Sequence, residues 1–133
     1  MSGDGNVKIE SNRKAVQQAL SEAIQRALTA CGITAQGYAT DAYVPVDTGR
    51  LKGSITYAVG KAHSQVRAPA KAEDGALHGA PDADTLYLGT NVEYAPYVEL
   101  GTHKQRSHPY LRPAFEQHVR EYERIIKSIL EGD

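Results

Sequence analysis

The first third of the chain has apolar or small residues at helical spacing, and this periodicity constrains the fold more than any other feature. The apolar and small positions are Val16, Leu20, Ile24, Ala27, Leu28, Cys31, Ala35, Tyr38 and Ala42. Polar residues such as Arg13, Gln17 and Glu22 fall on the other faces of the same helix. The pattern predicts one long amphipathic helix from Ser11 to about Tyr43.

Local residue types set the expected ends of this helix. Ser11 or Asn12 can cap its start, because a side-chain oxygen there can accept a hydrogen bond from an unpaired amide of the first turn. Gly32 and Gly37 weaken its second half and favour a bend or a break. The helix should end by Val44, since the following proline disfavours a helical conformation in the residue before it.

The middle of the chain carries the signals of two antiparallel strands. Asp47 is expected to cap a single helical turn that leads into a strand over residues 54–59. A second strand is predicted over residues 85–90, which are rich in strand-forming side chains and are bounded by Gly89 and Asn91.

The stretch between these strands is poor in large apolar side chains. From Gly60 to Asp84 the only large aliphatic residues are Val66 and Leu77. Such a segment has little to offset the entropy of ordering it. We therefore predict a long hairpin loop, mobile over residues 68–84, that packs no core.

Two further helices are predicted after the second strand. Residues 93–101 place Pro96 where a first helical turn tolerates proline and Gly101 where a helix end prefers glycine. Apolar residues then recur at helical spacing from Phe115 to Leu130, so the chain is expected to end on one amphipathic helix.

The predicted order of elements defines an α+β fold. A long N-terminal helix and a C-terminal helix pack a small antiparallel sheet. The 133 residues fit a single domain, 1–133, with a flexible N-terminus over residues 1–10. The first residues lack the pattern of a secretory signal, so we expect synthesis in the cytoplasm.

Composition excludes two broad classes of function. No apolar run approaches the ~20 residues of a membrane helix. The formal net charge is -1, which lacks the basic excess of a dedicated nucleic-acid binder. A nearly neutral protein can still line a path along which DNA slides, because strong attraction to phosphate would hinder movement.

No catalytic or metal-binding pattern is recognisable. Cys31 has no second thiol and is interpreted as a small core residue. A triad of Ser54 or Ser107 with His108 and Asp47 lacks an activating turn. The histidines lie mostly in predicted loops without ligand partners at useful spacing, namely His63, His78, His103, His108 and His118. We expect no enzyme, no cofactor, no metal and no small-molecule substrate.

Two pairs of charged residues have a structural interpretation. Asp47 is expected to pair with Arg50 inside the subunit, over the alternative of an ion pair across a subunit interface. Glu99 is expected to pair with Arg112 and so to clamp the short helix to the last one.

The glycines and tyrosines near these pairs also have structural interpretations. Gly49 and Gly101 are interpreted as turn residues. Tyr94, Tyr97 and Tyr110 are expected to pack against the sheet, although an assembly interface would favour tyrosine as well.

Two segments of the chain resemble a known family. The first reads VPVDTGRLKGSI over residues 44–55, and the second reads YAPYVELGT over residues 94–102, followed by HPYLRPAF over residues 108–115. In this order they resemble the signature of the phage tail-component family, whose members lie among the head-connector and tail genes of long-tailed phages. The motif or interface residues that the resemblance singles out are Asp47, Thr48, Gly49, Arg50, Leu51, Tyr94, Tyr97, Glu99, Gly101, Thr102, Pro109, Tyr110, Leu111, Arg112 and Pro113.

The resemblance implies a structural role in virion morphogenesis. It implies head-tail joining in the neck, or tail completion, by assembly into a ring that is hexameric in the virion. The partners would be further copies of the chain and neighbouring connector or tail proteins, with a passing contact to DNA in the channel. The alternative is a DNA-contacting module that uses Arg106, His108 and Arg112 with the basic pair Arg13 and Lys14.

Overall fold

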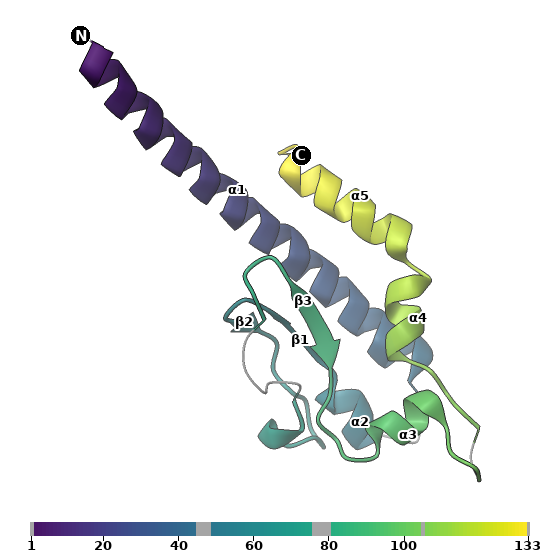
Figure 1. Cartoon of the computed structure of the whole chain (residues 1–133). Helices are drawn as coiled ribbons and strands as arrows, with labels where there is room; N and C mark the ends of the chain where they lie inside the picture. The colour runs from purple at the N-terminus through teal and green to yellow at the C-terminus, as the bar shows by residue number, and fades with distance from the viewer. Residues whose placement is uncertain (1, 45–48, 76–80, 105, 133) are drawn as a thin grey trace.

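A long helix dominates the shape of the molecule (Figure 1). The computed structural model describes residues 2–44, 49–75, 81–104 and 106–132, with side chains described from Arg13 onward. Helix α1 (Ser2–Tyr38) has 37 residues and is therefore about 55 Å long. Its first half projects beyond the body of the protein, while its second half lies along the sheet and the last helix (Figure 1).

The start of α1 differs from the sequence prediction. Because the backbone is already helical at Ser2, a cap at Ser11 or Asn12 is wrong. The flexibility predicted for residues 1–10 stays a prediction.

The second half of α1 contains no break at its glycines. The helix runs through Gly32 and Gly37 and changes to a π-helical turn, η1 (Ala39–Tyr43), only after Tyr38. The expected break is therefore wrong. The structure gives another reason for glycine at position 32: a Cβ atom there would lie 2.8 Å from Cδ1 of Tyr57, so glycine lets α1 approach the sheet closely. The helical region ends at Val44, whose backbone is extended, as predicted.

The sheet has three antiparallel strands in the order β2-β1-β3. A short helix, α2 (Gly49–Ser54), leads into β1 (Thr56–Val59), which turns at Gly60 into β2 (Ala62–His63). Strand β3 (Leu86–Gly89) pairs with the other edge of β1, with Tyr57 opposite Leu88. The two predicted strands and the helical turn before them are confirmed, with ends shifted by one or two residues.

The long loop between β2 and β3 covers part of the sheet, which the sequence prediction missed. A Cβ atom on Gly75 would lie 3.1 Å from Val66 and 3.7 Å from Thr56, so these three residues are packed together. Asp74, in the single 3-10 turn η2 (Ala72–Asp74), is only 2% exposed. None of the described residues of this loop belongs to the apolar core, so the expectation that the loop packs no core is confirmed; polar contacts and glycine hold the loop in place instead. Mobility over residues 68–84 stays a prediction, and residues 76–80 lie outside the described part of the chain.

The C-terminal third forms three helices, α3 (Ala95–Leu100), α4 (Leu111–Glu116) and α5 (Val119–Leu130). Helix α3 has Pro96 in its first turn and ends at Gly101, which has φ 80°, as predicted. The single C-terminal helix of the prediction is wrong, since residues 117–118 form a turn between α4 and α5. This turn redirects the chain so that α5 lies beside α1 (Figure 1).

Two apolar clusters hold these elements together, and the α+β class is confirmed. The smaller cluster joins Cys31 and Ala35 of α1 to Tyr122 of α5, which confirms Cys31 as a core residue. The larger cluster lies at the other end of the sheet and consists of Ala39, Val44, Leu51, Ile55, Val92, Ala95, Val98, Tyr110 and Ala114. Among the described helices, none is long and apolar enough to cross a membrane.

Candidate functional site

The motif segments that are far apart in sequence converge on one core. Leu51 of α2 and Tyr110, just before α4, are both fully buried in the larger cluster. The Tyr110 hydroxyl donates a hydrogen bond to the carbonyl of Ala95, 3.4 Å away, at the start of α3. Helices α2, α3 and α4 therefore gather at one end of the sheet (Figure 1).

Glu99 fixes α3 to α4 through backbone amides. Its Oε1 accepts hydrogen bonds from the amides of Tyr110 and Leu111, at 3.0 and 2.9 Å, and its Oε2 accepts from the amide of Arg112 at 3.3 Å. The first amides of a helix have no partner within the helix, so a carboxylate from elsewhere can cap them. Glu99 thus clamps α3 to α4 as predicted, but through backbone amides. The predicted ion pair between Glu99 and Arg112 is wrong, because the Arg112 guanidinium pairs with Glu116 at 3.4 Å.

Arg50 ties α2 to the loop before β3 and to the segment after it. Its Nε and Nη2 donate to the two carboxylate oxygens of Asp74, at 3.0 and 2.8 Å. Its Nη1 and Nη2 also donate to Glu93, at 3.1 and 3.2 Å. The predicted partner, Asp47, lies outside the described residues, so that pair is not tested. Sequence reasoning missed Asp74, because this residue falls in a segment without large apolar side chains.

The electrostatics of this network follow from its geometry. The hydrogen bonds from Arg50, with a further one from the amide of Lys71, lower the pKa of Asp74 to about 2. The two carboxylates raise the pKa of Arg50 above its already high ordinary value. The pKa of Glu93 is lowered by a hydrogen bond from its own backbone amide and by the Arg50 guanidinium. All three groups are therefore charged near neutral pH.

Backbone groups of the same loop are held by residues that follow β3. The amide of Asn91 donates to the carbonyl of Asp74 at 2.8 Å, and its side chain donates to the carbonyl of Gly75. The hydroxyl groups of Thr90 and Ser54 are joined by a hydrogen bond of 2.5 Å, and the Thr90 hydroxyl also donates to the Asp74 carbonyl. The Ser54 hydroxyl, considered above as a nucleophile, is thus buried among structural partners.

The remaining motif residues fall into different environments. Tyr110 packs as predicted and Tyr94 is half-buried against the same core, but Tyr97 is 57% exposed, so its predicted packing is wrong. Gly49 is the first residue of α2, and its interpretation as a turn residue stays a prediction. Leu111 and Pro113 are half-buried, Thr102 and Pro109 are exposed, and Thr48 lies outside the described residues.

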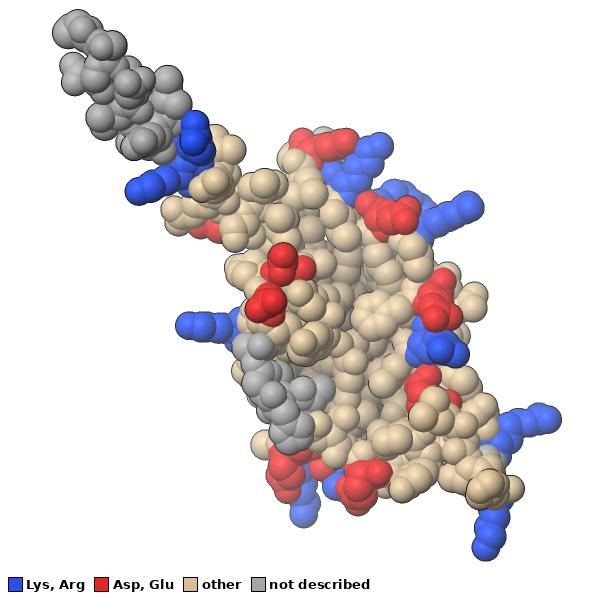
Figure 2. Space-filling view, viewed as in Figure 1, with Lys and Arg blue, Asp and Glu red and all other residues tan. Residues whose placement is uncertain are grey.

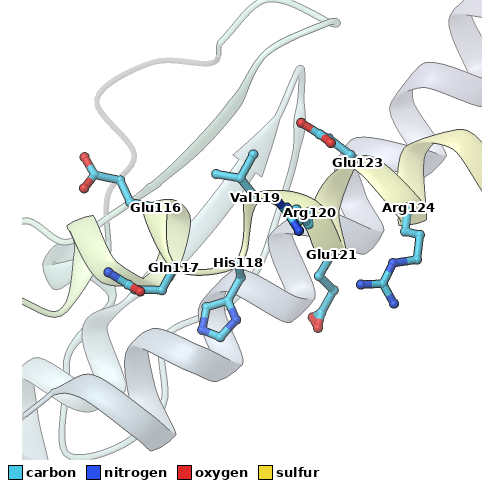
Figure 3. Close-up of a pocket in the computed structure, with 8 residues that line it drawn as sticks. All are labelled: Glu116, Gln117, His118, Val119, Arg120, Glu121, Glu123 and Arg124. Carbon is cyan, nitrogen blue, oxygen red and sulfur yellow. The ribbon is translucent and has the colours of Figure 1, made fainter.

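A second polar cluster lies where α4 turns into α5. The ring of His118 stacks on Tyr38 with centroids 3.5 Å apart, and its Nε2 is 2.9 Å from the hydroxyl of Tyr43. The Tyr38 hydroxyl donates to both oxygens of Glu121, at 2.7 and 2.8 Å, and this hydrogen bond raises the pKa of Tyr38. Figure 3 shows His118 and Glu121 pointing to the same side, while Val119 points the other way. These contacts hold the turn that the sequence periodicity did not reveal.

The other histidines are dispersed. His63 lies in β2 rather than in a loop, His103 and His108 are exposed, and His78 lies outside the described residues. Among the residues that the structure describes, no three metal-ligating side chains come together.

Comparisons of the chain with known protein families, with curated proteins and with solved structures give no match. The resemblance to the phage tail-component family therefore rests on the motif residues, and function must be inferred from the site and the surface.

The surface exposes several large apolar side chains. Leu100 and Tyr97 of α3 are 77% and 57% exposed, and Val16 and Leu20 lie open on the projecting half of α1. In the view of Figure 2, uncharged residues occupy much of the middle of the face, and most charged side chains lie towards its rim. A contiguous exposed apolar patch with a polar rim is typical of surfaces that contact other proteins.

Proposed function

We propose that this chain is a structural protein of virion morphogenesis in a long-tailed bacteriophage, acting in head-tail joining or tail completion by ring assembly. The observation that carries the proposal is the use of the motif residues. Leu51, Glu99 and Tyr110 come from segments that resemble the tail-component family, and they build one core and one helix cap. Residues with such roles maintain a shape that an assembly partner can bind.

The polar side chains of the motifs support a structural role in the same way. Arg50 is engaged by Asp74 and Glu93, and the Glu99 carboxylate by backbone amides. Groups held so tightly by protein partners serve the fold, and the proposal requires no catalysis, cofactor or small-molecule substrate.

The proposed partners are further copies of the chain, in a ring taken as hexameric in the virion, and neighbouring connector or tail proteins. The protein would be made in the host cytoplasm and end in the neck or tail. A net charge of -1 suits a ring through which DNA passes, because it gives no strong attraction to phosphate.

The proposal is tested by removing the protein from the phage or prophage that encodes it. With an early stop codon in the gene for this chain, electron micrographs of lysates should show heads and tails that are not joined, or tails with an abnormal end or an abnormal length. Wild-type protein supplied from a plasmid should restore joined particles. Normal infectious yield without the protein would refute the proposal.

A DNA-contacting module is the second candidate, and the exposed Lys104 and Arg106 are the observation in its favour. Arg13 and Lys14, however, lie on the projecting half of α1, at the opposite end of the molecule from the loop that holds Arg106 (Figures 1 and 2). The two groups therefore form no single basic surface. A titration with duplex DNA at several salt concentrations separates the candidates: tight binding that weakens steeply with salt would favour the DNA module.

A further inference from the structure

Charges are segregated along the second half of the chain. The segment 72–103 contains six acidic residues and no lysine or arginine, and the acidic residues are Glu73, Asp74, Asp82, Asp84, Glu93 and Glu99. The next segment, 104–115, contains Lys104, Arg106 and Arg112 and no acidic residue. Charge of one sign is thus followed directly by charge of the other sign.

The fold neutralises part of this charge and leaves the rest exposed. Asp74 and Glu93 share Arg50, the Glu99 carboxylate is used by amides, and Arg112 pairs with Glu116. Five exposed charged residues of these two segments form no ion pair within the described residues. Three are acidic, namely Glu73 in η2 and Asp82 and Asp84 before β3, and two are basic, namely Lys104 and Arg106 after α3.

Asp84 lines an apolar groove, and Asp82 lies two positions before it in the same loop. Where α1 passes the loop before β3, a groove is lined by Gln17, Leu20, Ser21, Ile24, Ala83 and Asp84. Leu20 is 52% exposed, so an apolar floor is open to solvent beside negative charge. We call this the acidic groove.

The two basic residues follow closely in sequence after Leu100, the most exposed large apolar residue among those described. Leu100 and Tyr97 project from α3, and Lys104 and Arg106 lie on the loop that follows. The amide of His108 donates to the carbonyl of Val98 at 2.7 Å, which returns this loop to α3. We call this surface, formed by Tyr97, Leu100, Lys104 and Arg106, the basic tip.

The acidic groove and the basic tip complement each other but cannot meet within one chain. The loop before β3 lies beside the middle of α1, whereas the loop after α3 projects at the far end of the body (Figure 1). Figure 2 shows negative side chains beside α1 and positive side chains at the opposite corner. A closed ring requires such a pair of different surfaces, because each subunit uses one patch on one neighbour and another patch on the next.

We propose that the basic tip of one copy docks into the acidic groove of the next. This proposal rests on the ring assembly proposed above and names the two surfaces that build it. Leu100 and Tyr97 cover the apolar floor at Leu20 and Ile24, while Lys104 and Arg106 reach Asp82 and Asp84. The named residues are few compared with the roughly 20–30 residues a side of a stable complex, so free copies associate weakly until several contacts form together.

Zero-length cross-linking of the purified protein tests the contact directly. A carbodiimide joins a lysine to a carboxylate that touches it, so concentrated wild type should give a ladder of cross-linked species. In a mixture of ¹⁴N- and ¹⁵N-labelled chains, mass spectrometry should find Lys104 joined to Asp82 or Asp84 of a differently labelled chain. Absence of this link at the highest soluble concentration would refute the proposal.

Charge reversal adds a sharper test. A tip variant, Lys104→Glu with Arg106→Glu, and a groove variant, Asp82→Lys with Asp84→Lys, each place like charges in the contact. Association of either variant alone, measured by sedimentation, should weaken by about tenfold or more. A 1:1 mixture of the two should recover, because every contact then again joins opposite charges. The proposal would be overturned if each variant alone associated as strongly as the wild type, or if association did not recover in the mixture.

A matched control reverses two other exposed cations. Arg13→Glu with Lys14→Glu changes the net charge as the tip variant does, but on the projecting half of α1, so association should stay at the wild-type level. If the tip variant instead loses DNA binding and keeps wild-type association in sedimentation, the basic tip belongs to the DNA module and the proposal is wrong.

The same variants separate this inference from the proposed function. If phages lacking the protein are rescued by the tip variant as well as by the wild type, the contact is wrong while the assembly role stands. If the cross-link forms but phages lacking the protein are normal, the contact stands and the assembly role is wrong.

Discussion

Arg50 and Asp74 form a two-pronged ion pair in which Nε and Nη2 donate to separate oxygens of one nearly buried carboxylate, at 3.0 and 2.8 Å. The pair joins α2, which carries the first motif, to a loop whose backbone is also held by Thr90 and Asn91. It therefore explains how a segment almost without large apolar residues can lie against the sheet.

Replacing Arg50 with lysine should loosen this loop. Lysine keeps the charge but cannot present two donors in a fixed plane to Asp74 while also reaching Glu93. We expect Arg50→Lys to lower the melting temperature by roughly 2–8 °C and to speed hydrogen exchange at residues 71–75. Arg67→Lys is the control, because the Arg67 side chain is exposed, and it should change neither quantity. Equal melting of the two variants would show that the paired geometry contributes nothing.

The same ion pair predicts how stability depends on pH. The pKa of Asp74 is lowered to about 2 in the folded protein by Arg50 and the Lys71 amide, whereas an aspartate in an unfolded chain titrates near 3.9. A depressed folded pKa gives stability that is fully present above about pH 5 and is lost as the pH falls through about 4 towards 2.

The measurement is denaturant unfolding of the wild type and Asp74→Asn between pH 6 and pH 2. The wild type should be the more stable of the two, by a margin that is constant above about pH 5 and shrinks below pH 4. Asp82→Asn, at an exposed position, should show no such change in its margin. A margin for Asp74→Asn that holds down to pH 2 would contradict the depressed pKa.

Glu99 should stabilise the protein through amides and not through Arg112. Glu99→Ala removes the acceptor of three amides at the start of α4, and the loss of a helix cap costs about 1 kcal/mol. Arg112→Ala should cost less than about 0.5 kcal/mol, because its pair with Glu116 is exposed. A double-mutant cycle should give a coupling near zero between Glu99 and Arg112. Strong coupling would restore the ion pair predicted from the sequence.

Elements whose signals lie within the element could be predicted from the sequence. The helical periodicity up to Tyr38, the proline after Val44 and the pair Pro96 and Gly101 each act on their own neighbours, and the structure has helices where these signals place them. The alternation around Tyr57 likewise predicted β1. Local chemistry was sufficient for these elements because no distant contact opposes it.

Contacts between distant segments could not be predicted in this way. Arg50 and Asp74 are joined by charge, and a search for apolar periodicity does not detect charge pairs across a loop. The turn between α4 and α5 depends on the stacking of His118 on Tyr38, which is eighty positions earlier in the chain. The apolar spacing continues through that turn, so the sequence pattern alone indicated one helix.

The two glycines in the second half of α1, Gly32 and Gly37, give the most direct test of how closely the helix approaches the sheet. Alanine is better than glycine inside a helix by about 1 kcal/mol, so Gly37→Ala, whose new Cβ meets nothing within 4 Å, should raise the free energy of unfolding by about 0.5–1 kcal/mol. Gly32→Ala gains the same propensity but places its Cβ 2.8 Å from the ring of Tyr57 and 3.0 Å from Leu86, so it should instead lower that free energy by about 1–3 kcal/mol. In a background of Tyr57→Ala the penalty at position 32 should shrink, because the ring is then gone. Equal gains from Gly32→Ala and Gly37→Ala in chemical denaturation would mean that α1 and β1 lie further apart in solution than these distances require.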